Sequence, residues 1–142
     1  MKVLLVDDHE MVRLGLKSFL SMQTDIDKVL EAQNGKAGVE LALKERPDVI
    51  IMDIVMPELN GIDATLAILK EWPEAKIVIL TSYLDNEKIY PVLDAGAKGY
   101  ILKTSSATEI LQAVRKVAKG EFAIETEAVS YTHLRAHETG AY

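Results

Sequence analysis

The chain has 142 residues, of which 49% are hydrophobic, and its formal net charge is −6. This length and hydrophobic content predict one globular domain, and the acidic balance argues against a surface built to hold nucleic acid. The chain has no cysteine and no apolar run long enough to cross a bilayer, which excludes disulfide, thiolate-metal and membrane-spanning designs. We therefore expect a cytoplasmic protein that does not contact membranes.

The first third of the chain reads as strand, helix, strand and helix. Val3–Val6 is apolar on both faces, which is typical of a central parallel strand, and it ends at two aspartates. The helix that follows carries an apolar stripe of Val12, Leu16, Phe19 and Leu20. Asp27–Ala32 is more polar, as an edge strand would be, and Asn34 is a candidate cap for a second helix.

The same alternation continues along the rest of the chain. Val49–Met52 and Ile77–Leu80 are two more strands that are apolar on both faces, and a third helix with Ile62, Leu66 and Leu69 lies between them. Gly99–Lys103 is a short fifth strand. The last helix opens with the capping-box pattern Ser106-Ala-Thr-Glu109.

The fourth predicted helix, about Asn86–Ala95, contains a proline and stops at Gly96, a candidate left-handed cap. Proline inside a regular helix costs ~3 kcal/mol, so Pro91 predicts a helix that starts late, kinks or is marginally stable. Such a helix would suit a responsive element, and the alternative is a static kink without a role.

These elements predict an α/β fold, a (βα)5 doubly wound parallel sheet of the flavodoxin-like type with strand order 2-1-3-4-5. Ligands of such sheets bind at the carboxyl ends of the strands, where the winding reverses. The residues there are Asp7 and Asp8 after the first strand, Asp53 after the third, Thr81 after the fourth and Lys103 at the end of the fifth. The topology therefore brings three acids, a hydroxyl and an amine into one shallow pocket.

This set of residue types indicates phosphoryl chemistry. Two carboxylates about 4 Å apart repel by roughly 4 kcal/mol at a dielectric constant of ~20, and a hard divalent cation such as Mg²⁺ would relieve that repulsion. Asp53 could then attack phosphorus, while the metal, Lys103 and the Thr81 hydroxyl would contact the phosphoryl oxygens. The pattern predicts a site that makes and holds an aspartyl phosphate.

Each residue also has an ordinary interpretation when it is taken alone. Asp8 could cap the first helix, Thr81 could be a turn residue, and Lys103 could be a surface lysine. We expect His9 to face solvent at the first helical turn and not to bind the metal, since a lone histidine favours softer ions. What favours the site over these alternatives is the coincidence of the acids with Lys103.

The chain resembles the receiver domains of bacterial two-component response regulators, which share the CheY-like fold, from Lys2 to about Gly120. The resemblance rests on four segments in order: "LLVDDHEMVR", "PDVIIMDIVMPELNGID", "IVILTSY" and "AGAKGYILKTSS". It implies phosphorylation of Asp53 by a sensor histidine kinase, with Asp7, Asp8 and the carbonyl of Val55 at the Mg²⁺ site. It also implies phosphoryl contacts from Thr81 and Lys103.

The same resemblance suggests how the signal leaves the site. Tyr100 would be the aromatic switch residue that responds to Thr81, although plain sheet packing would also account for it. The amino-acid sequence is most similar to the NarL/FixJ branch, and within it to cell-envelope-stress regulators of the LiaR/VraR type. That branch usually carries a C-terminal helix-turn-helix domain, so DNA binding would need a part that this chain lacks.

A homodimer formed on phosphorylation is the expected output. Candidate contacts are apolar residues on the first helix that lie off its buried stripe, with polar residues on the last helix: Met11, Leu14, Met22, Gln112, Arg115 and Lys116.

We expect residues 1–120 to form the receiver domain and residues 121–129 to begin a linker. Residues 130–142 do not resemble that linker and are predicted to be a non-native or disordered tail.

Two other functions stay open at this point. One is a stand-alone receiver that acts only through protein contacts. The other is a phosphatase of the haloacid-dehalogenase type, which needs a second aspartate where this chain has Val55. A flavodoxin-like cofactor carrier is disfavoured, because Asp7 and Asp8 would repel a phosphate that lacks a metal. We therefore expect a self-phosphorylating phosphoacceptor and not a turnover enzyme.

Overall fold

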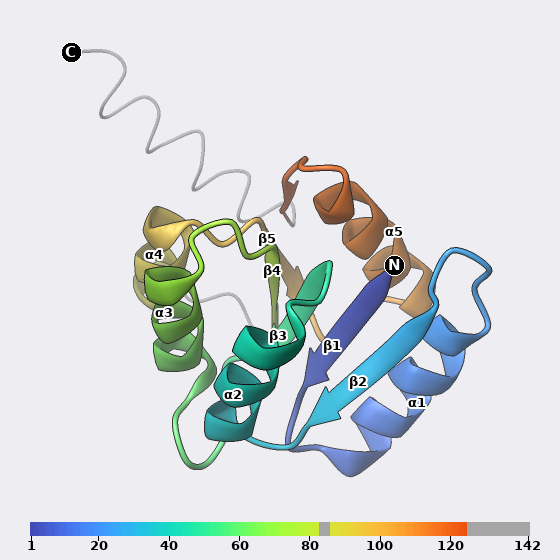
Figure 1. The fold of residues 1–142 in the computed structure, drawn as a ribbon, viewed down its shortest axis with the longest axis horizontal. Helices are drawn as coiled ribbons and strands as arrows, with labels where there is room; N and C mark the ends of the chain where they lie inside the picture. The colour runs from blue at the N-terminus through green and yellow to red at the C-terminus, as the bar shows by residue number, and fades with distance from the viewer. Residues whose placement is uncertain (83–85, 125–142) are drawn as a thin grey trace.

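The computed structural model describes residues 1–82 and 86–124, and it shows the predicted alternation of strands and helices around one sheet (Figure 1). The expected end of the linker, 125–129, and the expected tail, 130–142, lie outside the described residues. In chain order the elements are β1 (Lys2–Val6), α1 (Glu10–Ser21), β2 (Lys28–Ala32), α2 (Gly35–Glu45), β3 (Val49–Asp53), α3 (Gly61–Glu71), β4 (Ile77–Thr81), α4 (Asn86–Ala95), β5 (Gly99–Leu102), α5 (Ala107–Ala118) and β6 (Ala123–Ile124).

The sheet is parallel, with strand order β2-β1-β3-β4-β5-β6, which confirms the order predicted for the first five strands. A further short strand, β6, follows at the edge of the sheet, because part of the expected linker pairs with β5. The Ala123 backbone N–H donates to the Lys98 carbonyl at 3.0 Å, and Ala123 lies opposite Gly99 in register. The residues that follow α5 therefore add a strand to the edge of the sheet.

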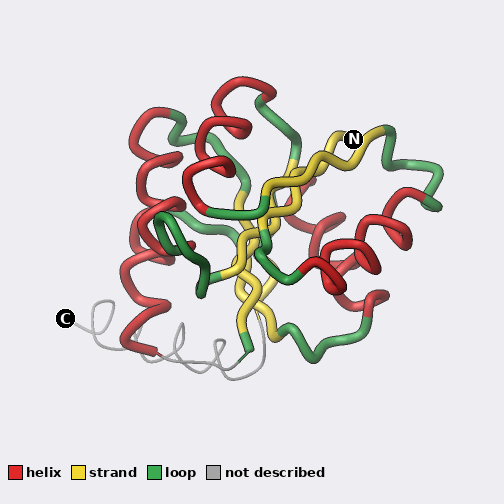
Figure 2. Tube along the Cα trace, turned by 90° about the horizontal axis from the view of Figure 1, so that it is seen from below, coloured by secondary structure: helices red, strands yellow, loops and turns green. Residues whose placement is uncertain are grey.

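Helices cover both faces of the sheet, with α1 and α5 on one face and α2, α3 and α4 on the other (Figures 1 and 2). Successive residues of a strand point to opposite faces, so Leu4 and Val6 join one buried cluster and Val3 and Leu5 join the other. Fully burying such side chains stabilises the fold by about 1.5–3 kcal/mol each. This two-sided burial explains why the central strands are apolar without alternation.

The predicted helix caps are present. The Asn34 side chain accepts a hydrogen bond from the Ala37 backbone N–H at 2.8 Å, and Ser106 and Glu109 form the reciprocal capping box of α5. Asn60 caps α3 in the same way as Asn34 caps α2. Helix α1 begins after His9, so Asp8 is not its N-cap residue and remains available to the site.

Helix α4 contains Pro91 and ends before Gly96, whose φ of +120° confirms the predicted glycine stop. The backbone N–H of Ala97 donates to the Val92 carbonyl at 2.9 Å, which closes the end of the helix. Whether this helix responds to the site stays a prediction. Within residues 1–82 and 86–124, none of the helices is both long and apolar enough to span a membrane.

Candidate functional site

The carboxyl ends of four neighbouring strands deliver the predicted residues to one edge of the sheet. Asp53 and Thr81 are the last residues of β3 and β4, and Asp7 and Lys103 directly follow β1 and β5. These positions agree with the predicted strand ends to within one residue. Because the four strands are adjacent and parallel, side chains that are far apart in the sequence converge as the topology predicted.

The acidic residues form a compact group. Asp7 is fully buried, Asp53 is 3% exposed, and Asp8 lies at the exposed edge. One potential ligand atom from each of Asp7, Asp8, His9 and Asp53 lies within 4.8 Å of the others. The buried Oδ2 of Asp7 accepts no hydrogen bond from any described residue, so it has a lone pair available for a further cationic ligand.

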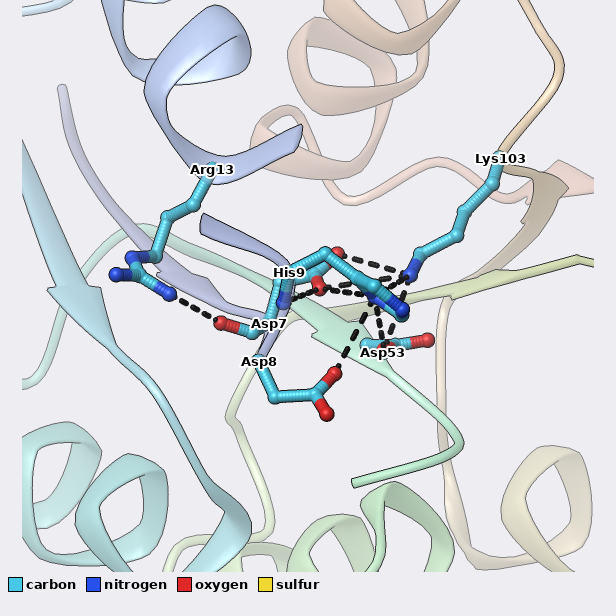
Figure 3. Close-up of polar contacts among 6 residues, drawn as sticks. All are labelled: Asp7, Asp8, His9, Arg13, Asp53 and Lys103. Carbon is cyan, nitrogen blue, oxygen red and sulfur yellow. Dashed lines mark hydrogen bonds and ion pairs between the residues drawn. The ribbon is translucent and has the colours of Figure 1, made fainter. Parts of the chain in front are cut away.

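Lys103 reaches into this acidic group (Figure 3). Its Nζ lies 3.1 Å from Oδ2 of Asp53 and 3.2 Å from Oδ2 of Asp7, and its side chain is only 11% exposed. The Lys103 backbone N–H also donates to the Thr81 carbonyl at 2.6 Å, which ties the ends of β4 and β5 together. The alternative of an ordinary surface lysine does not fit these contacts.

The electrostatic environment of Asp53 is unfavourable to its charge. Burial raises the pKa of the Asp53 carboxyl, and the neighbouring Asp7 carboxylate raises it further. The hydrogen bond and the positive charge of Lys103 act in the opposite direction without cancelling the shift. Added positive charge at this position would therefore favour the ionised, nucleophilic form of Asp53.

The two predicted switch residues are both buried. Thr81 is 4% exposed at the end of β4, beside the acids. Tyr100 is fully buried and belongs to the core cluster under α2, α3 and α4, so packing accounts for its position here. Their role in switching stays a prediction.

Val55 lies in the loop between β3 and α3, and its side chain is 62% exposed. Because the Val55 side chain is apolar and exposed, only the backbone of this residue could supply a ligand atom to the site. The proposed ligand role of its carbonyl oxygen stays a prediction.

His9 lies closer to the site than the sequence suggested. Its side chain is 57% exposed, in line with the expectation that it faces solvent. However, Nδ1 lies 3.0 Å from Oδ1 of Asp7, 3.3 Å from Oδ1 of Asp8 and 2.8 Å from Nζ of Lys103. Its position directly after two aspartates was the available signal, and only the direction of the side chain shows that it joins the site.

Arg13 is a site neighbour that sequence reasoning missed. Its guanidinium donates to the Asp7 carbonyl at 2.7 Å (Figure 3). It also pairs with Glu31 on β2 at 3.2 Å. These contacts hold the end of β1 against α1 and β2. Nothing in the local pattern pointed to this role, because it depends on how α1 docks on the sheet.

Gly61 allows the chain to pass close to Asp53. A Cβ atom at Gly61 would lie 1.8 Å from the Asp53 carbonyl oxygen, and the Gly61 N–H donates to the Ile54 carbonyl at 2.7 Å. The first turn of α3 therefore packs directly on the backbone that carries Asp53. This close approach is a finding of the structure.

Most residues of the predicted dimer surface are exposed, but Arg115 forms an ion pair within the chain. Met11, Leu14 and Met22 are 79%, 56% and 78% exposed, which confirms that they lie off the buried stripe of α1. On α5, Gln112 and Lys116 are exposed, whereas Arg115 forms a two-pronged ion pair with Asp25 in the loop after α1. Arg115 thus links α5 to the end of α1 within one chain.

The residue types in the site fit a hard cation and a phosphoryl group. Carboxylate oxygens are the protein ligands that Mg²⁺ prefers, and Mg²⁺ is usually held by one or two of them while it keeps waters or phosphate oxygens. Asp7 supplies a buried oxygen without a hydrogen bond, and Lys103 supplies a second positive charge beside Asp53. The arrangement can hold a charged oxygen-rich group over the Asp53 carboxylate.

The chain is similar to known proteins of one family. The chain matches the response regulator receiver domain family over residues 3–115. It is 48% identical to the transcriptional regulatory protein LiaR of Bacillus subtilis over 139 residues, covering 98% of this chain and 66% of that protein. It is also 47% identical to the response regulator protein VraR of Staphylococcus saprophyticus, covering 90% of this chain and 61% of that protein. The chain thus spans less than two thirds of the length of either relative.

A solved structure shows the same fold at lower identity. A LuxR-family two-component response regulator from Aurantimonas superposes with a TM-score of 0.83 at 29% identity, covering 91% of this chain and 92% of that one. The family match includes each of the site residues Asp7, Asp8, Asp53, Thr81 and Lys103. The chain therefore belongs to the receiver domains of two-component response regulators, and its relatives include LiaR and VraR.

Proposed function

We propose that this receiver domain accepts a phosphoryl group on Asp53 from a sensor histidine kinase, in the presence of Mg²⁺, and thereby changes its surface to control dimerisation. In the full-length protein this change would control transcription. The observation that carries the proposal is a buried Asp53 carboxylate beside the buried Asp7, with Lys103 Nζ 3.1 Å away. This pairing of a carboxylate with an ammonium supports a site for phosphoryl transfer.

The proposed step is an in-line transfer. A carboxylate oxygen of Asp53 forms a bond to phosphorus while the N–P bond of the donor phosphohistidine breaks, and its electron pair stays on the imidazole nitrogen. Lys103 binds an equatorial phosphoryl oxygen from the side of β5, and the Thr81 hydroxyl can donate to another. Burial of Asp53 limits access of water to the product.

The residues suited to hold Mg²⁺ are Asp7, Asp8 and Asp53, together with the carbonyl of Val55. Among these, the buried Oδ2 of Asp7 accepts no hydrogen bond from the described residues and lies 3.2 Å from Lys103 Nζ, which supports a place for a further positive partner. When bound, the ion would neutralise charge on the phosphoryl oxygens and the acids. Asp8 lies at the exposed edge and would complete the ligand set from the solvent side.

The proposed output connects the site to two surfaces. Thr81 and Tyr100 occupy neighbouring strands, so a shift of Thr81 toward the phosphoryl group could be accommodated by movement of Tyr100. Tyr100 lies in the cluster that also contains Val92 of α4, which offers a route to that helix. LiaR and VraR are named as a transcriptional regulator and a response regulator and are longer than this chain, which supports an output domain in the full-length protein.

The test is phosphorylation followed by intact mass measurement. Incubation with phosphoramidate or acetyl phosphate and Mg²⁺ should add one phosphoryl group to the wild-type chain and none to Asp53→Asn. Asp63→Asn, an exposed aspartate on α3, is the matched control and should accept phosphate normally. A normal adduct on Asp53→Asn, or none on the wild type, would contradict the proposal.

A further inference from the structure

His9 occupies the N-cap position of α1 but does not act as its cap. Its backbone is extended, with φ −86° and ψ 103°, and its side chain makes no capping hydrogen bond to the described residues of the helix. The His9 backbone N–H instead donates to Oδ1 of Asp7 at 2.8 Å. This bond turns the imidazole toward the acidic group, where Nδ1 meets Lys103 (Figure 3).

The Lys103 ammonium has three N–H donors and finds three acceptor residues. Its distances are 2.8 Å to Nδ1 of His9, 3.1 Å to Oδ2 of Asp53 and 3.4 Å to Oδ1 of Asp7. The contact with His9 is the shortest of these three. The three acceptors come from the start of α1 and the ends of β3 and β1, so they surround the ammonium from different directions.

The contact with Lys103 also determines which ring nitrogen of His9 carries the proton. A lysine ammonium can only donate, so Nδ1 must accept and the ring proton must lie on Nε2. A proton on Nδ1 would point at an ammonium 2.8 Å away and would repel it. In this tautomer Nδ1 of His9 and Oδ1 of Asp7, 3.0 Å apart, are both acceptors, and the Lys103 ammonium that contacts both of them offsets their repulsion.

We propose that His9 is a positioning residue for Lys103. The lysine side chain is a flexible four-carbon chain with a freely rotating ammonium, and two buried carboxylates compete for it. By taking one N–H, Nδ1 fixes the ammonium so that the other two N–H groups face Asp53 and Asp7. The consequence for phosphoryl transfer rests on the proposed function, whereas the position of the ammonium does not.

The experiment compares His9→Ala, which removes the acceptor, with His9→Asn, whose Oδ1 can take the place of Nδ1. Glu10→Gln, an exposed neighbour in the first turn of α1, is the control. The first measurement is the ¹H–¹⁵N signal of the Lys103 ammonium without Mg²⁺ or phosphodonor, assigned by its loss in Lys103→Arg. The second is the rate of phosphoryl uptake from phosphoramidate with Mg²⁺, across donor concentrations.

The wild-type chain and Glu10→Gln should show a protected ammonium signal, because three hydrogen bonds slow its exchange with water. His9→Ala should lose that signal, and its limiting uptake rate should fall about tenfold with little change in the donor concentration for half-maximal rate, because a displaced group costs rate and not donor binding. His9→Asn should recover the signal and most of the rate. A thermal melt should show that His9→Ala stays folded, since the side chain does not cap α1.

Several results would overturn the proposal. They are the absence of a protected ammonium signal in the wild type, an unchanged signal and rate in His9→Ala, or no recovery in His9→Asn. Weaker Mg²⁺ binding by His9→Ala with an unchanged Lys103 signal would instead make His9 a metal ligand. Failure of the wild type to accept phosphate would contradict the proposed function, while the ammonium signal would still decide the role of His9.

Discussion

At Asp53, burial and the Asp7 carboxylate raise the pKa of the side chain, and Lys103 lowers it by less than they raise it. The folded protein therefore binds a proton at Asp53 more readily than the unfolded chain does. Between the two pKa values the folded state holds more protons, so the free energy of unfolding falls as pH rises through this window. Above the folded-state pKa of Asp53, its ionised carboxylate makes the fold less stable than a neutral side chain would.

We predict that Asp53→Asn raises the free energy of unfolding at pH 7, because the amide has no charge to bury. This increase in the free energy of unfolding should be complete above the pKa of Asp53 in the folded protein. It should disappear as pH falls toward about 4, the usual pKa of an aspartate in an unfolded chain. Urea unfolding of both chains at several pH values without Mg²⁺ measures this. Equal stability at pH 7 would show that the charge of Asp53 is already compensated by Lys103.

Asp8 differs from its neighbours because it lies at the exposed edge of the acidic group. We predict that Asp8→Asn weakens Mg²⁺ binding by about tenfold, the size expected for loss of a metal-site group. Its melting temperature without the ion should be equal or higher, since one of the repelling charges is gone. Calorimetric titration with Mg²⁺ and a thermal melt test both parts, and unchanged Mg²⁺ affinity would remove Asp8 from the ligand set.

Among the elements, α3 packs its first turn directly on the backbone that carries Asp53. A methyl group at Gly61 would overlap the Asp53 carbonyl oxygen, which is backbone and cannot turn aside. The start of α3 and the end of β3 must therefore separate if any larger residue replaces Gly61. The position of Asp53 thus depends on a residue that carries no side chain.

We predict that Gly61→Ala lowers the free energy of unfolding by about 1–3 kcal/mol, as overpacking does, and slows phosphoryl uptake by displacing Asp53. Gly15→Ala is the control: no atom lies within 4 Å of a Cβ there, and alanine in the helix should stabilise by about 0.5–1 kcal/mol. Urea unfolding of both variants gives the values. A neutral Gly61→Ala would mean that α3 can move away without cost.

Helix α4 is the element best suited to respond to the site. Pro91 lies inside it and removes one backbone hydrogen bond, which weakens the helix relative to a regular one. We predict that hydrogen exchange over residues 86–95 changes when Asp53 is phosphorylated or bound by beryllofluoride. The exchange of α2, which packs on the same face of the sheet, is the internal control. Identical exchange in both states would remove Pro91 and Tyr100 from the switch.

For the whole molecule, the exposed apolar residues of α1 and the polar surface of α5 lie on one face of the sheet. The ion pair between Arg115 and Asp25 joins α5 to the loop that follows α1. A second copy of the chain could bury the apolar side chains against this face. The output of the site would then be a change in how strongly two receiver domains associate.

We predict that the chain is mainly monomeric without phosphate and forms a weak, concentration-dependent dimer with beryllofluoride. Leu14→Asp should prevent that dimer because it would bury a charge, while Lys44→Asp on α2 should not affect it. Sedimentation at several protein concentrations measures both. An unchanged mass with beryllofluoride would refute dimerisation through the receiver, and a normal dimer of Leu14→Asp would refute only the α1 surface.

The sequence alone determined most of the fold and which strand-end residues lie together at the site. Strand and helix positions follow from the spacing of apolar residues, and the caps at Asn34 and Ser106 are local hydrogen-bond patterns. Once the strand order is known, the carboxyl ends of adjacent parallel strands must meet, so Asp53 and Lys103 could be placed together before any coordinates. These features need only local periodicity and a topological rule.

Only the tertiary structure decided the features that depend on how elements dock. The sixth strand exists because Ala123 pairs with β5, the His9 ring joins the site because it meets Lys103 from the end of β5, and Arg115 forms an ion pair because Asp25 lies opposite it. Gly61 matters because two backbones meet there. Each of these contacts joins residues through space at a distance and direction that no local pattern encodes, since they are set by the packing of whole helices and strands.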